Sequence, residues 1–201
     1  MFICLYLLPG GPYNQKNHKK RCFFEPEVIY RNVEEHIRLL KPDNYPDYLT
    51  IVSNGEPTLD INLGKTIKLL KRTGIPVAVI TNASLIIYDS VKEDLYQADW
   101  VSVKSDASDN DVWQTINRPD SQLDFDTHLK NIFLFAAEYK GDLHTETMII
   151  DGLNDSTDHL EKVADIVKKI QPLKAYLSVP IRPPSEKKVL APDPEKLNIA
   201  W

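Results

Sequence analysis

The chain is poor in the residues and runs that mark several common classes of protein. It has two cysteines, Cys4 and Cys22, in 201 residues, too few for the disulfide framework of a small secreted domain. No apolar run reaches the length of a transmembrane helix. The apolar start, Met1–Leu8, lacks the basic region and cleavage site of a signal peptide. These absences favour a cytoplasmic protein in a reducing compartment and give no sign of a membrane partner.

The charge balance sets a further limit. Lys and Arg number 24 against 29 Asp and Glu, and the net charge of −5 gives no electrostatic footprint for non-specific binding to nucleic acid. DNA is therefore not an expected partner, although a local basic groove stays possible. Hydrophobic residues make up 42% of the chain and charged residues 26%, as in an ordinary globular protein with a real core.

Familiar catalytic motifs are also absent. The chain has no P-loop, no G-x-G-x-x-G after a strand, no G-x-S-x-G and no H-E-x-x-H. Its 5 histidines lack metal-ligand spacing. His144 and Glu146 are two residues apart on an expected strand and would share one face. A half-buried strand face is the simpler interpretation, and a metal site is the alternative.

What the chain does have is an alternation of two hydrophobic patterns. Helical spacing, as in the segment that begins at Pro26 and ends before Pro42, separates short apolar runs that are typical of buried strands. This alternation predicts an α/β fold with a parallel sheet and right-handed crossovers. The expected strands are Tyr48–Ser53, Pro76–Thr81, Trp100–Val103, Leu143–Ile150 and Ala175–Val179.

Polar, ligand-capable residues follow nearly every expected strand. Gly55, Glu56 and Pro57 follow the strand at residues 48–53, and Pro57 gives Glu56 a defined backbone direction. An ordinary turn with a solvated Glu56 is the equal alternative. Polar strand ends all round favour a barrel-like sheet over an open doubly wound one. The other polar ends are Thr81–Asn82, Lys104–Asp106, Asp151–Asn154 and Arg182.

The order and spacing of several short motifs resemble the radical S-adenosylmethionine (radical SAM) superfamily. More narrowly, the chain resembles iron–sulfur oxidoreductase-like proteins related to the wyosine tRNA-modifying enzymes. The resemblance implies a partial (β/α)6 TIM-like barrel over residues 1–184 and an extended Pro-rich tail over residues 185–201. The motifs are Gly55–Leu59, Val77–Leu85, Val101–Ala107, Ile116–Pro119, Gly152–Asp155 and Val179–Pro184.

The resemblance also implies a set of residues that bind S-adenosylmethionine (SAM). The Glu56 carboxylate would accept a charge-assisted hydrogen bond from the SAM ammonium, and Arg182 would hold a carboxylate or phosphate. Lys104 stands where the family has a serine, which puts the expected ribose contact in doubt. The implied cofactor-binding residues are Gly55, Glu56, Pro57, Thr81, Asn82, Asp106, Asn154 and Arg182.

The family's cysteine motif, C-x3-C-x2-C, is incomplete in this chain. In the family three thiolates hold a [4Fe-4S] cluster, and the cluster cleaves bound SAM to a 5′-deoxyadenosyl radical. Cys4 aligns with the middle cysteine and Leu7 with the last, while the first would precede Met1. Cys22 matches no ligand position. We therefore expect residues 1–24 to be a degenerate cluster loop, the first barrel strand to be missing, and Cys4 to be the one retained metal ligand or a small buried side chain.

Two functional hypotheses stay open at this point. One is a radical SAM enzyme whose N-terminus is truncated or displaced, with a small-molecule or RNA substrate and a possible electron-donor protein as partners. The other is a cluster-less family member that binds SAM, a nucleotide or a partner without radical catalysis. Leu7 distinguishes the two: a displaced start does not explain an internal leucine at a ligand position, which requires a local frameshift or real degeneration.

Overall fold

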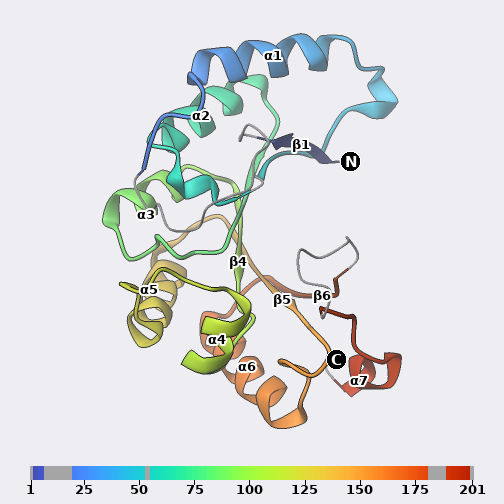
Figure 1. The fold of residues 1–201 in the computed structure, drawn as a ribbon. Helices are drawn as coiled ribbons and strands as arrows, with labels where there is room; N and C mark the ends of the chain where they lie inside the picture. The colour runs from blue at the N-terminus through green and yellow to red at the C-terminus, as the bar shows by residue number, and fades with distance from the viewer. Residues whose placement is uncertain (1, 7–19, 53–54, 181–188, 200–201) are drawn as a thin grey trace. The chain divides into compact units, whose positions relative to one another are not determined.

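The computed structural model describes residues 2–6, 20–52, 55–180 and 189–199, where strands and helices alternate along the chain (Figure 1). None of the described helices is long and apolar enough to cross a membrane. The elements are β1 (Phe2–Tyr6), α1 (Pro26–Arg38), β2 (Tyr48–Val52), α2 (Leu63–Leu70), β3 (Val77–Thr81), α3 (Asp89–Leu95), β4 (Trp100–Lys104), α4 (Asn110–Ile116), α5 (Phe125–Glu138), β5 (Asp142–Met148), α6 (Thr157–Ile170), β6 (Lys174–Ser178) and α7 (Pro194–Ile199).

The strands are hydrogen-bonded in the order β1-β2-β3-β4-β5-β6. The pairs β1–β2, β2–β3 and β5–β6 are parallel, which confirms the expected α/β fold. The expectation of a missing first strand is wrong in this structure. Phe2 lies opposite Tyr48 and Tyr6 opposite Val52. The edge of β2 would otherwise expose unpaired backbone groups, and the apolar run at the start of the chain pairs with them.

The chain divides into two compact units, Met1–Ser102 with Tyr139–Asp142, and Val103–Glu138 with Leu143–Trp201. In the first unit α1 packs beside α2, and α2 beside α3 (Figure 1). Its core joins strand residues with one face of these helices, because apolar positions recur every two residues in the strands and every three or four in the helices. Fully buried members are Leu49, Ile51, Ile67, Leu70, Val77, Val79 and Leu95. The expected single core domain over residues 1–184 stays a prediction.

Local sequence signals place the helix ends of the first unit. Pro26 occupies the first turn of α1 and, with Ile29, Val33 and Ile37, forms its buried face. Gly74 ends the helical segment after α2 in the left-handed conformation, with φ of 79°, which glycine adopts without steric cost.

Gly141 has a different role from the helix cap that its place after α5 suggests. A Cβ atom there would lie 2.6 Å from the backbone oxygen of Asp99 and 2.4 Å from the hydroxyl of Tyr139. The same hydroxyl donates a 2.8 Å hydrogen bond to the carbonyl of Ala98. Glycine is required because two backbone segments approach each other closely, not because of the dihedral angle.

In the second unit α5 packs beside α6, and an aromatic cluster joins α4 to α5. Trp113 lies 5.5 Å from Phe125 and 5.1 Å from His128 between ring centroids, and the imidazole is stacked on the indole at 22°. His128 is 4% exposed, and its Nδ1 makes no hydrogen bond within the described residues. Burial lowers the pKa of His128 to about 4, because the charged imidazolium is disfavoured away from water.

The buried imidazole predicts a specific loss of stability in acid. The unfolded histidine takes up a proton near pH 6.5, whereas the folded one stays neutral until about pH 4. Stability is therefore complete above pH 6.5 and falls as the pH drops between these values. At pH 5 the loss is about 2 kcal/mol relative to pH 7.5.

Denaturant unfolding of wild type and His128→Phe at pH 7.5 and pH 5 measures this term. The variant keeps an aromatic ring beside Trp113, so we expect its pH dependence to be smaller by that amount. His36→Gln, at an exposed position of α1, is the matched control. Equal pH dependence in wild type and His128→Phe contradicts the assignment.

The sequence predicted an extended C-terminal tail, but part of the tail is helical. Pro194–Ile199 forms the short helix α7. Asp193 accepts a hydrogen bond from the backbone N–H of Glu195, and the Lys196 ammonium lies 3.1 Å from Asp151 and 2.6 Å from Asp155. A proline in the first turn and an aspartate before it are favourable helix-start signals, and these signals outweigh the extended tendency of the proline-rich composition.

Candidate cofactor-binding strand ends

In the first unit, the ends of β2 and β3 meet at the carboxylate of Glu56. Its Oε1 accepts hydrogen bonds from the Thr58 backbone N–H at 3.1 Å, the Thr58 hydroxyl at 2.7 Å and the Thr81 hydroxyl at 2.5 Å. Its Oε2 accepts from the backbone N–H of Asn82 at 2.8 Å. The structure thus brings together Glu56, Thr81 and Asn82, three of the residues implied by the resemblance, through direct hydrogen bonds.

Glu56 is 2% exposed and is therefore not the solvated charge of the alternative interpretation. Burial raises the pKa of this carboxyl group, while its hydrogen-bond donors, Thr81 first, act to lower it. Because its oxygens already accept from four groups of the chain, the carboxylate holds the two strand ends in register. Pro57 follows it at the start of the short 3-10 segment Pro57–Leu59 and is buried.

A tight turn follows β3. Ala83 has a left-handed φ of 58°, and its backbone N–H donates to the Thr81 hydroxyl at 2.9 Å. The Asn82 side chain accepts from the backbone N–H of Ser84 at 2.8 Å. Asn82 is exposed and Gly55 is half-buried. The exposed group at this end is therefore the Asn82 side chain, whose backbone N–H donates to the buried Glu56.

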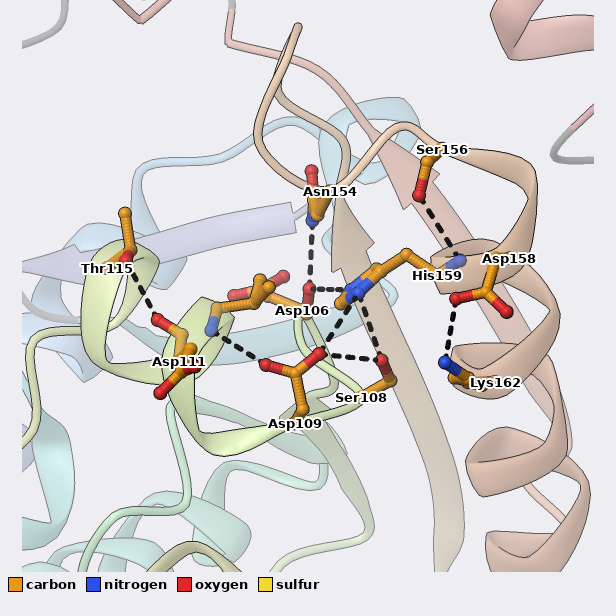
Figure 2. A network of polar contacts seen from close by, with 11 residues as sticks. Asp106, Ser108, Asp109, Asp111, Thr115, Asn154, Ser156, Asp158, His159 and Lys162 are labelled. Carbon is orange, nitrogen blue, oxygen red and sulfur yellow. Dashed lines mark hydrogen bonds and ion pairs between the residues drawn. The ribbon is translucent and has the colours of Figure 1, made fainter.

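In the second unit, the ends of β4 and β5 meet at Asp106 and Asn154 (Figure 2). Asn154 is 0% exposed. Its Nδ2 donates to the carbonyls of Asp106 at 2.8 Å and Met148 at 2.9 Å, and its Oδ1 accepts from the backbone N–H of Ile150 at 2.8 Å. The amide therefore uses both of its hydrogens and its oxygen within the chain, and it acts as a latch between the two strand ends.

The Asp106 carboxylate is also turned inward. Its oxygens accept from the backbone N–H of Met148 at 2.7 Å and from the Asn117 amide at 3.0 Å. Burial raises the pKa of Asp106, and the nearby Lys104 ammonium acts in the opposite direction. The structure thus brings Asp106 and Asn154 together as structural partners, with their polar groups hydrogen-bonded within the chain.

His159 joins the same network from the first turn of α6 (Figure 2). Its Nδ1 lies 3.0 Å from the Ser108 hydroxyl and 3.7 Å from the Asp109 carboxylate, and its Nε2 lies 3.4 Å from the carbonyl of Asp106. A Ser-His-Asp triad needs serine and aspartate on opposite ring nitrogens. Here both face Nδ1, so this histidine supports the loop and is not a hydrolase base.

Sequence reasoning missed His159, Ser108 and Thr58. The available signal was the position of Ser156, three residues before His159, since the Ser156 hydroxyl accepts from the His159 backbone N–H at 3.3 Å. It marks the start of a helix, but it does not show that the histidine in the first turn contacts a loop more than 50 residues earlier.

One face of β4, β5 and β6 carries polar side chains, and we call Lys104, His144, Glu146, Tyr176 and Ser178 the polar sheet face. The Lys104 ammonium lies 3.3 Å from Glu146 Oε1, and the Ser178 hydroxyl donates to the same oxygen at 2.9 Å. The rings of His144 and Tyr176 stack with centroids 5.6 Å apart. His144 and Glu146 therefore share a face, as predicted, and the lysine that replaces the family's serine has an acidic partner.

The structure does not test the prediction that Cys4 is a retained metal ligand. Cys4 lies within β1, where its backbone is opposite Thr50; its side chain, like Leu7 and Arg182, lies outside the described part. Cys22 is exposed, and its sulfur contacts the Asn62 amide at 3.3 Å and Glu25 at 3.7 Å. Among the described residues no three His, Cys, Asp or Glu side chains gather to hold a metal ion. With two cysteines in the chain, the donor set does not fit a cluster held by three thiolates.

Comparison with curated proteins finds relatives that match nearly the whole of this chain. It is 43% identical to a UPF0026 protein from Methanocaldococcus jannaschii over 98% of this chain and 61% of that protein. A GTPase Obg from Brachyspira hyodysenteriae is 33% identical over 99% of this chain and 29% of that protein, yet the present 201 residues contain no P-loop. The chain thus spans less than two thirds of either relative. No protein-family model matches it.

Solved structures define the fold. TYW1 with a lysine–pyruvate adduct bound superposes with a TM-score of 0.64 at 19% identity, over 84% of this chain and 59% of that one. SuiB from Streptococcus suis, bound to S-adenosylmethionine, has a TM-score of 0.62 at 16% identity, over 85% of this chain and 37% of that one. This likeness confirms the expected fold class, that of the radical SAM partial barrels. The chain is similar to UPF0026 proteins and has the fold of radical SAM enzymes, so the predicted resemblance to that superfamily is confirmed for the fold.

Proposed function

We propose that this chain is a radical SAM superfamily protein that binds S-adenosylmethionine at the ends of β2 and β3. The observation that carries the proposal is the Glu56 cluster, in which one buried carboxylate holds Thr58, Thr81 and the backbone of Asn82 together. A fold shared with SuiB, a protein solved with S-adenosylmethionine bound, supports the same ligand here.

The residues present fit a polar ligand rather than a metal. The exposed Asn82 amide can donate to and accept from a ligand, and its backbone N–H is held by Glu56 at 2.8 Å. In this assignment Glu56 is a positioning residue, in place of the direct ammonium contact that the resemblance implied. When bound together with an iron–sulfur cluster, S-adenosylmethionine supplies a 5′-deoxyadenosyl radical. The two cysteines do not fit that cluster, and we assign this chain no radical step.

The ligand and the cluster are tested separately. Equilibrium dialysis with labelled S-adenosylmethionine should show binding to wild type and at least tenfold weaker binding to Asn82→Ala. Asn32→Ala, on the exposed surface of α1, should bind like wild type. Absence of binding to wild type overturns the proposed function.

Cluster content is measured after anaerobic reconstitution with iron and sulfide. We expect substoichiometric iron and no cluster charge-transfer absorbance, because one aligned cysteine cannot hold the cubane. A full cluster on each chain contradicts this part of the proposal. The substrate, a small molecule or RNA, and an electron-donor partner stay predictions from the resemblance alone.

A further inference from the structure

The polar sheet face retains hydrogen-bonding capacity that the other polar strand ends of the second unit have used. Asp106 and Asn154 are satisfied within the chain. The Lys104 ammonium, by contrast, has one described partner for three hydrogens. Glu146 uses Oε1 for both of its partners, Lys104 and Ser178. Within the described residues its other oxygen accepts no hydrogen bond.

Stability does not explain this pair. The side chains of Lys104 and Glu146 are 23% and 26% exposed, and ion pairs in contact with water contribute about 0–1 kcal/mol. Placing two charges on a sheet face that could carry apolar residues costs desolvation. The pair is therefore better explained as a recognition element, in which the remaining Lys104 hydrogens and the second Glu146 oxygen bind a ligand.

The charges restrict what that ligand is. The pair has no net charge, so an anion such as phosphate would be repelled by Glu146 and a simple cation would be repelled by Lys104. A ligand group with an ammonium and a carboxylate side by side satisfies both at once: its carboxylate accepts from Lys104, and its ammonium donates to the open oxygen of Glu146. An α-amino acid group has this arrangement.

The aromatic pair beside the charges restricts the ligand further. Tyr176 lies directly opposite Glu146 in the β5–β6 register and is 44% exposed. Its ring is held by stacking on the buried His144 at 5.6 Å. A rigid, half-exposed ring is a good surface for a planar or apolar side chain.

We propose that the polar sheet face binds the α-amino acid group of a ligand between Lys104 and Glu146, with the ligand's side chain against Tyr176. The ligand we propose is an amino acid distinct from S-adenosylmethionine. The inference goes beyond the proposed function, because it concerns residues of the second unit and does not use the Glu56 cluster.

Ligand-observed NMR titration tests the charge requirement. L-Phenylalanine should bind, whereas 3-phenylpropionate, which lacks the ammonium, and phenethylamine, which lacks the carboxylate, should bind at least tenfold more weakly. Lys104→Met and Glu146→Gln should each weaken L-phenylalanine at least tenfold. Lys130→Met and Glu161→Gln, at exposed helix positions of the same unit, are matched controls and should bind like wild type.

Parallel titrations with S-adenosylmethionine distinguish an amino acid ligand from the cofactor. If L-phenylalanine does not bind but Lys104→Met and Glu146→Gln weaken S-adenosylmethionine, the recognised group belongs to the cofactor and the proposal is overturned. If both variants bind S-adenosylmethionine like wild type and no amino acid binds, the proposal fails while the proposed function survives. If L-phenylalanine binds as expected and S-adenosylmethionine does not, the proposed function fails and this site stands. Equal binding of L-phenylalanine and its two analogues also overturns the proposal.

Discussion

Glu56→Gln is expected to lower the free energy of unfolding by about 3 kcal/mol, because it places a donor against donors in a buried site. The Glu56 oxygens face two backbone N–H groups, from Thr58 at 3.1 Å and Asn82 at 2.8 Å. Backbone N–H groups cannot become acceptors. Whichever way the glutamine amide is turned, its NH2 faces one of them and leaves it unpaired at a residue that is 2% exposed.

Chemical denaturation of wild type and variant measures this loss. Glu35→Gln, the same substitution at an exposed position of α1, should unfold within about 0.5 kcal/mol of wild type. Thr81→Ala should produce an intermediate loss, since it removes one of the four donors. A Glu56→Gln variant as stable as the Glu35→Gln control would falsify the assignment of Glu56 as the clamp between β2 and β3.

Glu56→Gln also tests whether Glu56 acts by positioning Asn82. At a temperature where Glu56→Gln is still folded, the backbone of Asn82 is no longer held by an acceptor, and we expect S-adenosylmethionine to bind more weakly. Asn82→Ala should weaken binding while leaving stability near that of wild type, because its amide is exposed. A variant of Glu56 that loses stability but binds the ligand normally contradicts the positioning role.

Asn154→Asp is expected to be the second large effect, at about 3 kcal/mol or more. The change keeps the shape of the side chain and the bond to the Ile150 N–H. It replaces the two donor hydrogens, which point at the carbonyls of Asp106 and Met148, with an oxygen. A carboxylate would then face two carbonyl oxygens at a position that is 0% exposed, and an unpaired buried charge is strongly destabilising.

The pH dependence of Asn154→Asp provides an internal check. Protonating the new carboxyl group returns one donor, so the variant should recover part of its stability as the pH is lowered, relative to wild type. Asn32→Asp on the exposed face of α1 is the matched control and should show no such recovery. If Asn154→Asp unfolds like wild type at neutral pH, Asn154 is not the latch that joins β4 and β5.

The sequence by itself determined the order of the elements. Alternating hydrophobic periods predicted the strands and helices, and Pro26 marked a helix start that the structure confirms. These features are local, because backbone dihedral preferences and the two periodicities act over a few residues. The same local information indicated which strand ends carry polar residues, and it identified Lys104 as a departure from the family pattern.

Only the tertiary structure decided what those polar residues do. Glu56 and Asn154 were expected to face a ligand, yet both are buried and bonded to partners 26 and 48 residues away. Gly141 is a point of close backbone approach to Asp99. Lys104 and Glu146, 42 residues apart, form a pair. Burial and hydrogen-bond direction depend on which distant segments of the chain contact each other, and no local sequence pattern encodes those contacts.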